Sequence, residues 1–248
     1  MDSDNPRLMA ERYDDISARH YAAYRPPLHG LILKRLVPAE RSFRVGLDIG
    51  CGTGCSAIAL ARHCDRVIGL EPSQEMLARA RSHPGVTYLH GSAFELPRLP
   101  LGPVDVVSFA GSLFYTKTDV LRHDLPKVCA RSAVVLVYDF EIQLDEILDG
   151  FGVSTPSAAS SVSQYDHTCD LSGWSGFAVE ARGTERIGLD LQPSELAHLL
   201  LSDSNRRDAL AQRFPEKDPF QILKGILGEN CTFRGVHADL FFSRWRIQ

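Results

Sequence analysis

Apolar residues recur with two different periods along the first 140 residues of the chain. Short apolar runs bounded by glycine or polar clusters are typical of buried strands, whereas apolar residues three and four apart predict helices with one buried face. The predicted strands are residues 45–49, 66–70, 86–89, 104–109 and 133–138. The predicted helices are residues 8–24, 28–36, 55–64, 72–81 and 118–130. Because strands and helices alternate, the pattern predicts parallel βαβ units and an open, doubly wound α/β sheet.

The pattern changes after Phe140. Residues 150–176 are rich in serine and glycine and predict a long irregular segment, which in a compact domain is a lid, a binding segment or disorder. Two long strands are predicted at 177–191 and 238–247, with helices at 193–201 and 219–227 between them. We find no internal repeat and no clear linker.

We therefore expect a single domain over residues 1–248, with an antiparallel strand at its C-terminal end. Its expected parts are a helical cap at 1–40, a ligand-binding core at 43–140 and a substrate-side elaboration at 141–248.

Composition and charge narrow the class of protein. The 248 residues are 44% hydrophobic and 23% charged, which excludes a disordered, collagen-like or coiled-coil chain. The formal net charge of −4 disfavours nucleic acid as a partner. No apolar run approaches the roughly 18–20 residues of a membrane span. The residues after Met1 lack the cationic and apolar regions of a secretory signal, so we expect a cytoplasmic protein without a membrane partner.

The six cysteines give no sign of a disulfide framework or a metal site. They are scattered, without a CxxC pair, and a disulfide framework is not expected in a cytosolic chain. Cys51 and Cys55 are four residues apart but straddle a glycine-rich turn. We therefore expect no metal.

The strongest local signal is the segment Leu47-Asp48-Ile49-Gly50-Cys51-Gly52-Thr53-Gly54, where a predicted strand runs through three glycines into a predicted helix. Glycine lets a ligand approach the backbone and tolerates positive φ. The exposed N–H groups and the helix N-terminus make the turn electropositive. Asp48, one residue before the end of the strand, can anchor the loop or reach an ammonium group of a ligand.

A second signal is Glu71, which ends the next predicted strand. An acid at this position accepts hydrogen bonds from both ribose hydroxyls of a nucleoside. The simpler alternative is a βαβ unit in which the acid only caps a helix. Residues 52–57 also satisfy the dinucleotide pattern G-x-G-x-x-A. However, the Asp48 carboxylate would repel a pyrophosphate and suits a sulfonium ligand with an amino-acid tail.

In these features the chain resembles the class I S-adenosylmethionine-dependent methyltransferases, specifically the branch that acts on small molecules. The matching segments are 47–54, Glu71 with residues 72–77 behind it, 91–97 and 104–109. Residues 21–27 resemble the entry helix of that branch. The resemblance covers roughly residues 9–140 and does not extend to residues 141–248. It implies a Rossmann-like methyltransferase fold and S-adenosylmethionine as the cofactor.

The resemblance also implies roles for individual residues. Gly50 and Gly52 would let the backbone approach the methionine part, Asp48 would lie near its ammonium, and Glu71 would bind the ribose. The other implied contacts are Tyr21 and Arg25 at the carboxylate, Pro72 beside Glu71, Met76 near the adenine, Ser92, Ala93 and Phe94 at the adenine edge, and Phe109 at the sulfonium. Many relatives carry an acid at the position of Ser92, and a serine hydroxyl accepts a hydrogen bond more weakly.

The sequence after the fourth predicted strand bears on the methyl acceptor. Residues 109–115 lack the Asp/Asn-Pro-Pro-Tyr/Phe pattern used on nucleic-acid amino groups, which favours a small, partly apolar metabolite or natural product. The candidate catalytic residues are Tyr115, Tyr138 and Asp139 at strand carboxyl ends, and Tyr165 and His167 in the irregular segment. A histidine beside an acid can act as a base near neutral pH. A solvated loop histidine and a helix-capping Asp139 are the competing interpretations.

Other functions stay open at this stage. The protein could consume S-adenosylmethionine without methyl transfer, by attack on another sulfonium carbon that releases 5′-methylthioadenosine. It could also bind the nucleoside without catalysis, or be a dinucleotide-dependent oxidoreductase. The expected assembly is a monomer or a homodimer. The acceptor itself cannot be named from the sequence.

Overall fold

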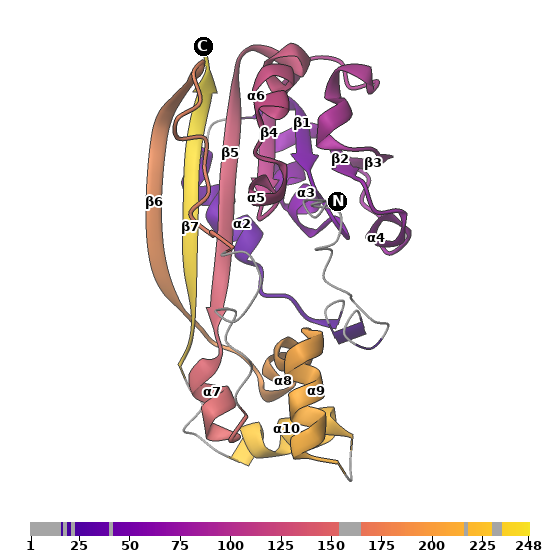
Figure 1. Ribbon diagram of the computed structural model, residues 1–248, viewed down its shortest axis with the longest axis vertical. Helices are drawn as coiled ribbons and strands as arrows, with labels where there is room; N and C mark the ends of the chain where they lie inside the picture. The colour runs from indigo at the N-terminus through magenta and orange to yellow at the C-terminus, as the bar shows by residue number, and fades with distance from the viewer. Residues whose placement is uncertain are drawn as a thin grey trace, which may run out of the picture. The chain divides into compact units, whose positions relative to one another are not determined.

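The computed structural model describes residues 16, 19, 20, 23–39, 42–153, 165–215, 218–229 and 235–248. Its seven strands form one sheet in the order β3-β2-β1-β4-β5-β7-β6 (Figure 1). The strands are β1 (Phe43–Ile49), β2 (Cys64–Glu71), β3 (Val86–His90), β4 (Val104–Ala110), β5 (Cys129–Gln143), β6 (Phe177–Leu189) and β7 (Val236–Ile247). Strands β1 to β5 are parallel to one another, and β7 runs opposite to β5. The predicted open, mostly parallel α/β sheet with a C-terminal antiparallel strand is confirmed.

The helices are α2 (Leu28–Leu36), α3 (Cys55–Leu60), α4 (Gln74–Ala78), α5 (Leu113–Thr116), α6 (Asp119–Asp124), α7 (Asp145–Gly150), α8 (Pro193–Leu201), α9 (Ser204–Arg213) and α10 (Pro219–Glu229). In the part of the chain that the structure describes, three 3₁₀ turns accompany them: η2 (Ala61–His63), η3 (Ala93–Arg98) and η4 (Leu125–Val128). Among the described residues, no helix has the length and apolar character to cross a membrane.

The chain divides into two compact units. The sheet unit comprises Pro27–Glu141, Tyr165–Glu185 and Leu240–Gln248. The helical unit comprises Met1–Pro26, Ile142–Gln164 and Arg186–Asp239. The sequence-based division into a single domain with cap, core and elaboration stays a prediction.

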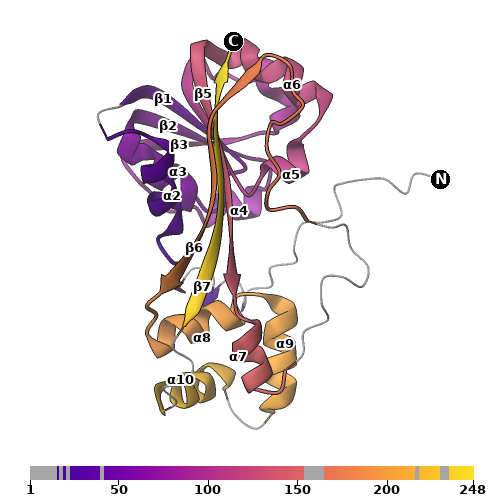
Figure 2. The same cartoon turned by 90° about the vertical axis from the view of Figure 1, so that its left-hand side faces the viewer.

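The sheet unit is covered on both faces of its parallel strands. In β5, Val135 and Val137 pack in a core cluster together with Leu121 of α6, while the intervening Val134 and Leu136 are equally buried. Because successive strand residues point to opposite faces, both faces must be covered. Figure 2 shows α2 and α3 on one face and α5 and α6 on the other. This arrangement explains why the strand sequences are continuous apolar runs.

The helical unit has its own core, formed by α7 to α10 and the residues next to them. The buried leucines of this core include Leu148, Leu200, Leu210 and Leu223. Helices α8 and α10 agree with the predicted 193–201 and 219–227. Helix α9 was not predicted, because its sequence SNRRDALAQR buries only one residue and therefore shows almost no apolar period.

Several predicted helices are shorter in the structure, for local reasons. Helix α4 begins only after Ser73, whose hydroxyl caps it by accepting a hydrogen bond from the Met76 N–H at 3.2 Å. The predicted helix 118–130 is α6 followed by η4, since Pro126 cannot donate a helical hydrogen bond. The predicted helix 8–24 lies largely outside the described residues.

Candidate functional site

The loop between β1 and α3 is built on three glycines with left-handed backbone conformation. Their φ angles are 74° at Gly50, 55° at Gly52 and 88° at Gly54, values that L side chains rarely adopt. A Cβ on Gly50 would lie 2.6 Å from the Cβ of Ser112, and the Ser112 hydroxyl donates a hydrogen bond to the carbonyl of Ile49. The first glycine therefore lets the turn after β4 close onto the loop.

The other two glycines differ in the space around them. A Cβ on Gly54 would lie 1.9 Å from the Tyr88 hydroxyl oxygen and 2.7 Å from its ring, so Gly54 is required by packing. Apart from its two chain neighbours, the one atom of the described residues within 4 Å of a Cβ on Gly52 is the terminal methyl carbon of Met76, at 3.3 Å. The backbone at Gly52 is thus open, with a flexible apolar side chain beside it, and suits a bound nucleoside.

Glu71, at the end of β2, holds this loop from the neighbouring strand. One carboxylate oxygen accepts a hydrogen bond from the Gly52 N–H and the other from the Ser73 N–H, both at 2.9 Å. A carboxylate oxygen has a second lone pair, so each oxygen can also accept from a ligand hydroxyl. Glu71 has the position and the acceptor capacity to bind a ribose, as the resemblance implies.

Asp48 is fully buried beneath the loop. Its two oxygens accept hydrogen bonds from the hydroxyls of Ser56 in α3 and Ser108 in β4. Burial raises its pKa to about 6, although both hydrogen bonds oppose the shift. Of the two roles considered from the sequence, the structure shows the anchoring one; an approach to a ligand ammonium stays a prediction.

The raised pKa of Asp48 predicts a specific pH dependence of stability. Between pH 4 and pH 6 the folded protein holds a proton that the unfolded chain has lost, so ionisation of Asp48 lowers stability as the pH rises. Replacing Asp48 by asparagine removes this titration. We expect the variant's free energy of unfolding, relative to the parent, to increase by about 2 kcal/mol between pH 4 and pH 7. Urea unfolding at several pH values measures this, and parallel curves for the two proteins would contradict it.

The residues predicted to surround the adenine lie in α4 and η3 and the segments before them. Met76 is half-buried beside Gly52, whereas Pro72 is exposed. The Ser92 hydroxyl caps η3 by accepting a hydrogen bond from the Phe94 N–H at 3.3 Å. Ala93 is buried, and Phe94 is exposed. Their contacts with an adenine stay predictions.

Three other residues predicted to bind S-adenosylmethionine are placed differently. Tyr21 lies outside the described residues. Arg25 belongs to the helical unit, whereas the glycine loop belongs to the sheet unit, so its contact with the cofactor stays a prediction. Phe109 has no exposed surface and packs in the core of the sheet unit, so the structure presents it as a core residue and not as part of a ligand surface.

A second group of polar residues lies beside the carboxyl end of β4, where Ala110 pairs with Tyr138. Tyr138 and Asp139 were predicted at the carboxyl end of their strand, but β5 continues to Gln143 and places them within it. Asp139 of β5 places one carboxylate oxygen 2.8 Å from Nδ1 of His167 and 2.7 Å from the hydroxyl of Tyr165. The Tyr165 hydroxyl is also 2.8 Å from the carbonyl oxygen of Gly111, so its single proton is shared between two acceptors. Three of the predicted catalytic residues, far apart in sequence, are thus brought into direct contact.

These contacts decide what each residue can do chemically. The hydrogen bond to Asp139 raises the pKa of His167 and orients its ring, which is the arrangement of a general base held by a carboxylate. Burial and Asp139 raise the pKa of Tyr165, so its phenol stays protonated and is a positioning group. Tyr138 is buried, with its hydroxyl 3.2 Å from Nδ1 of His29, and burial raises its pKa as well. Tyr115 is exposed.

The Asp139–His167 pair can be tested by titration. In an NMR titration of the imidazoles, we expect His167 to titrate above 6.5, and Asp139→Asn to lower this pKa because the acceptor charge is lost. Tyr165→Phe is expected to raise the pKa of His167, because Asp139 then loses a hydrogen-bond donor and interacts more strongly with the imidazolium. A His167→Gln spectrum assigns the signal. A His167 pKa that neither variant changes would exclude the pair.

The glycine loop and the Asp139–His167 pair are joined by one turn. Gly111 and Ser112 follow β4; Ser112 contacts the glycine loop, and Gly111 contacts Tyr165. A Cβ on Gly111, whose φ is 75°, would also lie 3.2 Å from Asp139. The resemblance to the methyltransferases implies that Gly111 and Ser112 border the sulfonium, a contact that stays a prediction.

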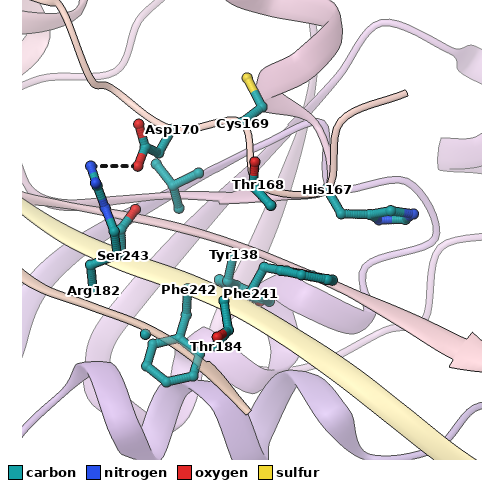
Figure 3. Close-up of a pocket in the computed structure, with 12 residues that line it drawn as sticks. Tyr138, His167, Thr168, Cys169, Asp170, Arg182, Thr184, Phe241, Phe242 and Ser243 are labelled. Carbon is teal, nitrogen blue, oxygen red and sulfur yellow. Dashed lines mark ion pairs between the residues drawn. The ribbon is translucent and has the colours of Figure 1, made fainter. Parts of the chain in front are cut away.

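A small pocket lies beside His167 on the sheet unit (Figure 3). Its volume is 60 Å³. Its lining residues are Val137, Tyr138, His167, Thr168, Cys169, Asp170, Arg182, Gly183, Thr184, Phe241, Phe242 and Ser243. Arg182 and Asp170 form an ion pair at 2.6 Å across its edge, and the His167 ring points away from them. The pocket accommodates a few atoms and is too small for a nucleoside.

Comparison with known proteins agrees with this geometry. Residues 47–136 match a methyltransferase domain family. A protein of Dictyostelium discoideum described as a methyltransferase is 25% identical over 190 residues, which cover 76% of this chain and 68% of the relative. A solved type II methyltransferase from Anaeromyxobacter dehalogenans is 20% identical with a TM-score of 0.59, over 91% of this chain and 98% of that chain. A methyltransferase structure from Bacillus halodurans is 14% identical with a TM-score of 0.52, over 88% and 97%.

Proposed function

We propose that this chain methylates a small-molecule acceptor with His167 as the general base. The premise of this proposal is that the chain is a class I, Rossmann-like methyltransferase that uses S-adenosylmethionine. The observation that carries this proposal is the Asp139–His167 pair, which the turn after β4 connects to the glycine loop. The oriented base and the nucleoside loop therefore belong to one site in the sheet unit.

The residues of the loop fit the cofactor. The open backbone at Gly52, the acceptor oxygens of Glu71 and the side chain of Met76 would hold the ribose and the base. When bound, S-adenosylmethionine supplies an activated methyl group on a sulfonium. The protein's task is then to orient the acceptor, exclude water and remove a proton.

His167 is suited to removing that proton. Asp139 engages Nδ1, so the imidazole presents Nε2 to the acceptor. After proton transfer, Asp139 stabilises the imidazolium, while Tyr165 keeps Asp139 in place through the turn at Gly111. Tyr115, exposed at the same end of the sheet, would contact the acceptor.

Two features of the chain support a small acceptor. The net charge is −4, and the segment after β4 lacks the pattern used on nucleic-acid amino groups. The proposal extends to a metabolite or natural-product pathway, a cytoplasmic location and a monomeric or homodimeric protein. The SAM contacts of Tyr21, Arg25, Ser92, Ala93 and Phe94 are part of the same proposal.

The deciding experiment is incubation of the purified protein with S-adenosylmethionine, alone and with a small-molecule library, followed by mass spectrometry of the nucleosides. We expect S-adenosylhomocysteine only when an acceptor is present. Release of 5′-methylthioadenosine from the cofactor alone, above the spontaneous background, would overturn methyl transfer in favour of cofactor consumption. Binding with no turnover across the library would favour a non-catalytic nucleoside-binding role.

A further inference from the structure

Aromatic rings gather around the Asp139–His167 pair. Tyr165 lies at the centre, with ring centroids 4.8 Å from Phe114, 5.5 Å from Tyr115 and 4.7 Å from His167. Phe241 of β7 stacks on His167, with ring centroids 5.7 Å apart. We call Phe114, Tyr115, Tyr165 and Phe241 the aromatic cluster. All four belong to the sheet unit.

The orientation of the rings favours a compact guest over a flat one. The plane of Tyr165 is inclined by 36° to that of Tyr115 and by 55° to that of Phe114, and Phe114 is perpendicular to Tyr115. A slot for a planar ring would need two parallel faces about 7 Å apart, twice the usual stacking distance. Rings inclined in several directions can instead turn more than one face toward a rounded group, as in aromatic sites that bind ammonium ions over their ring faces.

The charges around His167 also favour a positive guest. Three carboxylates act on the imidazole: Asp139, which bonds it directly, Glu141 and Asp166. Among the described residues, Lys117 acts on Asp166 as an opposing charge, and Arg182, which lines the same pocket as His167, is paired with Asp170. Since carboxylates outnumber cations here, an acceptor carrying a carboxylate or phosphate at this point would be repelled, and an ammonium would be attracted.

We propose that the aromatic cluster binds the ammonium group of an amine acceptor and delivers its nitrogen to Nε2 of His167. This inference rests on the proposed function and names the substrate class of the same site. An electron-rich ring face attracts a cation, and Tyr115, whose side chain is 51% exposed, supplies the most accessible face of the cluster.

The chemistry balances for such an acceptor. His167 Nε2 takes one proton from the ammonium, which leaves a neutral amine with a free electron pair. The amine nitrogen then forms a bond to the methyl carbon, the carbon–sulfur bond breaks, and sulfur keeps its electron pair. The products are a methylated ammonium and S-adenosylhomocysteine. The ammonium proton, now on His167, returns to solvent.

The test uses two probes of equal shape that differ in charge: choline and 3,3-dimethylbutan-1-ol, its neutral carbon isostere. Dissociation constants are measured by ligand-observed NMR on the full chain with S-adenosylhomocysteine present. We expect choline to bind about fivefold more tightly, the preference that one well-placed cation–π contact of about 1 kcal/mol provides. Equal binding of the two probes, or tighter binding of the neutral one, would overturn the proposal.

Variants at Tyr115 test whether the preference for choline arises from the aromatic cluster. Because Tyr115 is exposed, its substitution leaves the core intact. Tyr115→Leu is expected to reduce the choline preference at least twofold, while Tyr115→Phe keeps the ring face and the preference. A preference that survives Tyr115→Leu unchanged would place the cation elsewhere. Calorimetry with S-adenosylhomocysteine separates the two proposals, because intact nucleoside binding without a choline preference refutes only the amine acceptor.

Discussion

Replacing Gly54 by alanine is expected to lower the free energy of unfolding by about 3 kcal/mol. Two costs add at this position. The φ angle of 88° is unfavourable for any residue with a Cβ, and the new methyl group would lie 1.9 Å from the hydroxyl oxygen of Tyr88. Tyr88 cannot move away easily, because its hydroxyl donates a hydrogen bond to the Arg81 carbonyl at 2.7 Å. Urea unfolding followed by circular dichroism measures the loss.

Gly102 provides the matched control. Its φ angle is 62°, but apart from its two chain neighbours no atom of the described residues lies within 4 Å of the position that a Cβ would take. Gly102→Ala therefore carries the conformational cost alone, and we expect a loss of about 1 kcal/mol. If the two variants lose the same stability, the close approach of Tyr88 to the loop has no energetic importance and the packing argument for Gly54 fails.

The second large effect is expected on cofactor binding. Glu71→Gln should weaken the affinity for S-adenosylhomocysteine by about 30- to 100-fold, because hydrogen bonds to a charged acceptor contribute about 1.5–3 kcal/mol each. The amide would also turn an N–H₂ group toward the N–H of Gly52 or of Ser73, both of which donate to the carboxylate in the parent. The loop geometry would then change together with the ribose contact. Isothermal titration calorimetry measures the change.

Glu75→Gln is the control for this prediction. It makes the same chemical change four residues later, at an exposed position in the first turn of α4. We expect its affinity for S-adenosylhomocysteine to equal that of the parent. A Glu71→Gln protein that binds as tightly as the Glu75→Gln protein would remove Glu71 from the nucleoside site.

These two predictions concern different functions of one loop. Gly54 is required by the packing of the loop against β3, through Tyr88. Gly52 and Glu71 form the side that stays open to a ligand. Substitution of Gly54 should therefore lower mainly the free energy of unfolding, and substitution of Glu71 mainly the affinity for S-adenosylhomocysteine. The two effects can thus be measured separately in the same set of proteins.

Local sequence predicted most of the sheet unit, because each element there carries a complete local signal. Helix α2 and the starts of β3 and β4 fall at the predicted residues, since apolar period and glycine or proline boundaries act within a few positions. The strand–turn–helix at Gly50 to Gly54 was predictable for the same reason: positive φ at glycine is a property of the residue itself. Helix α9 was missed because its stability depends on burying Leu210 in the helical unit and not on its own pattern.

The sequence by itself determined the α/β fold, the glycine loop and the acidic residue at the end of β2, since these depend on patterns within about 30 residues. Only the tertiary structure decided how the remaining polar residues are used. Asp48 is an anchor because Ser108, from another strand, reaches its carboxylate. The His167 ring is held in one orientation because β5 brings Asp139 to it, and because Tyr165 links Asp139 to the turn after β4. Such contacts join residues far apart in the chain, so their geometry follows from strand order and packing, which no local pattern specifies.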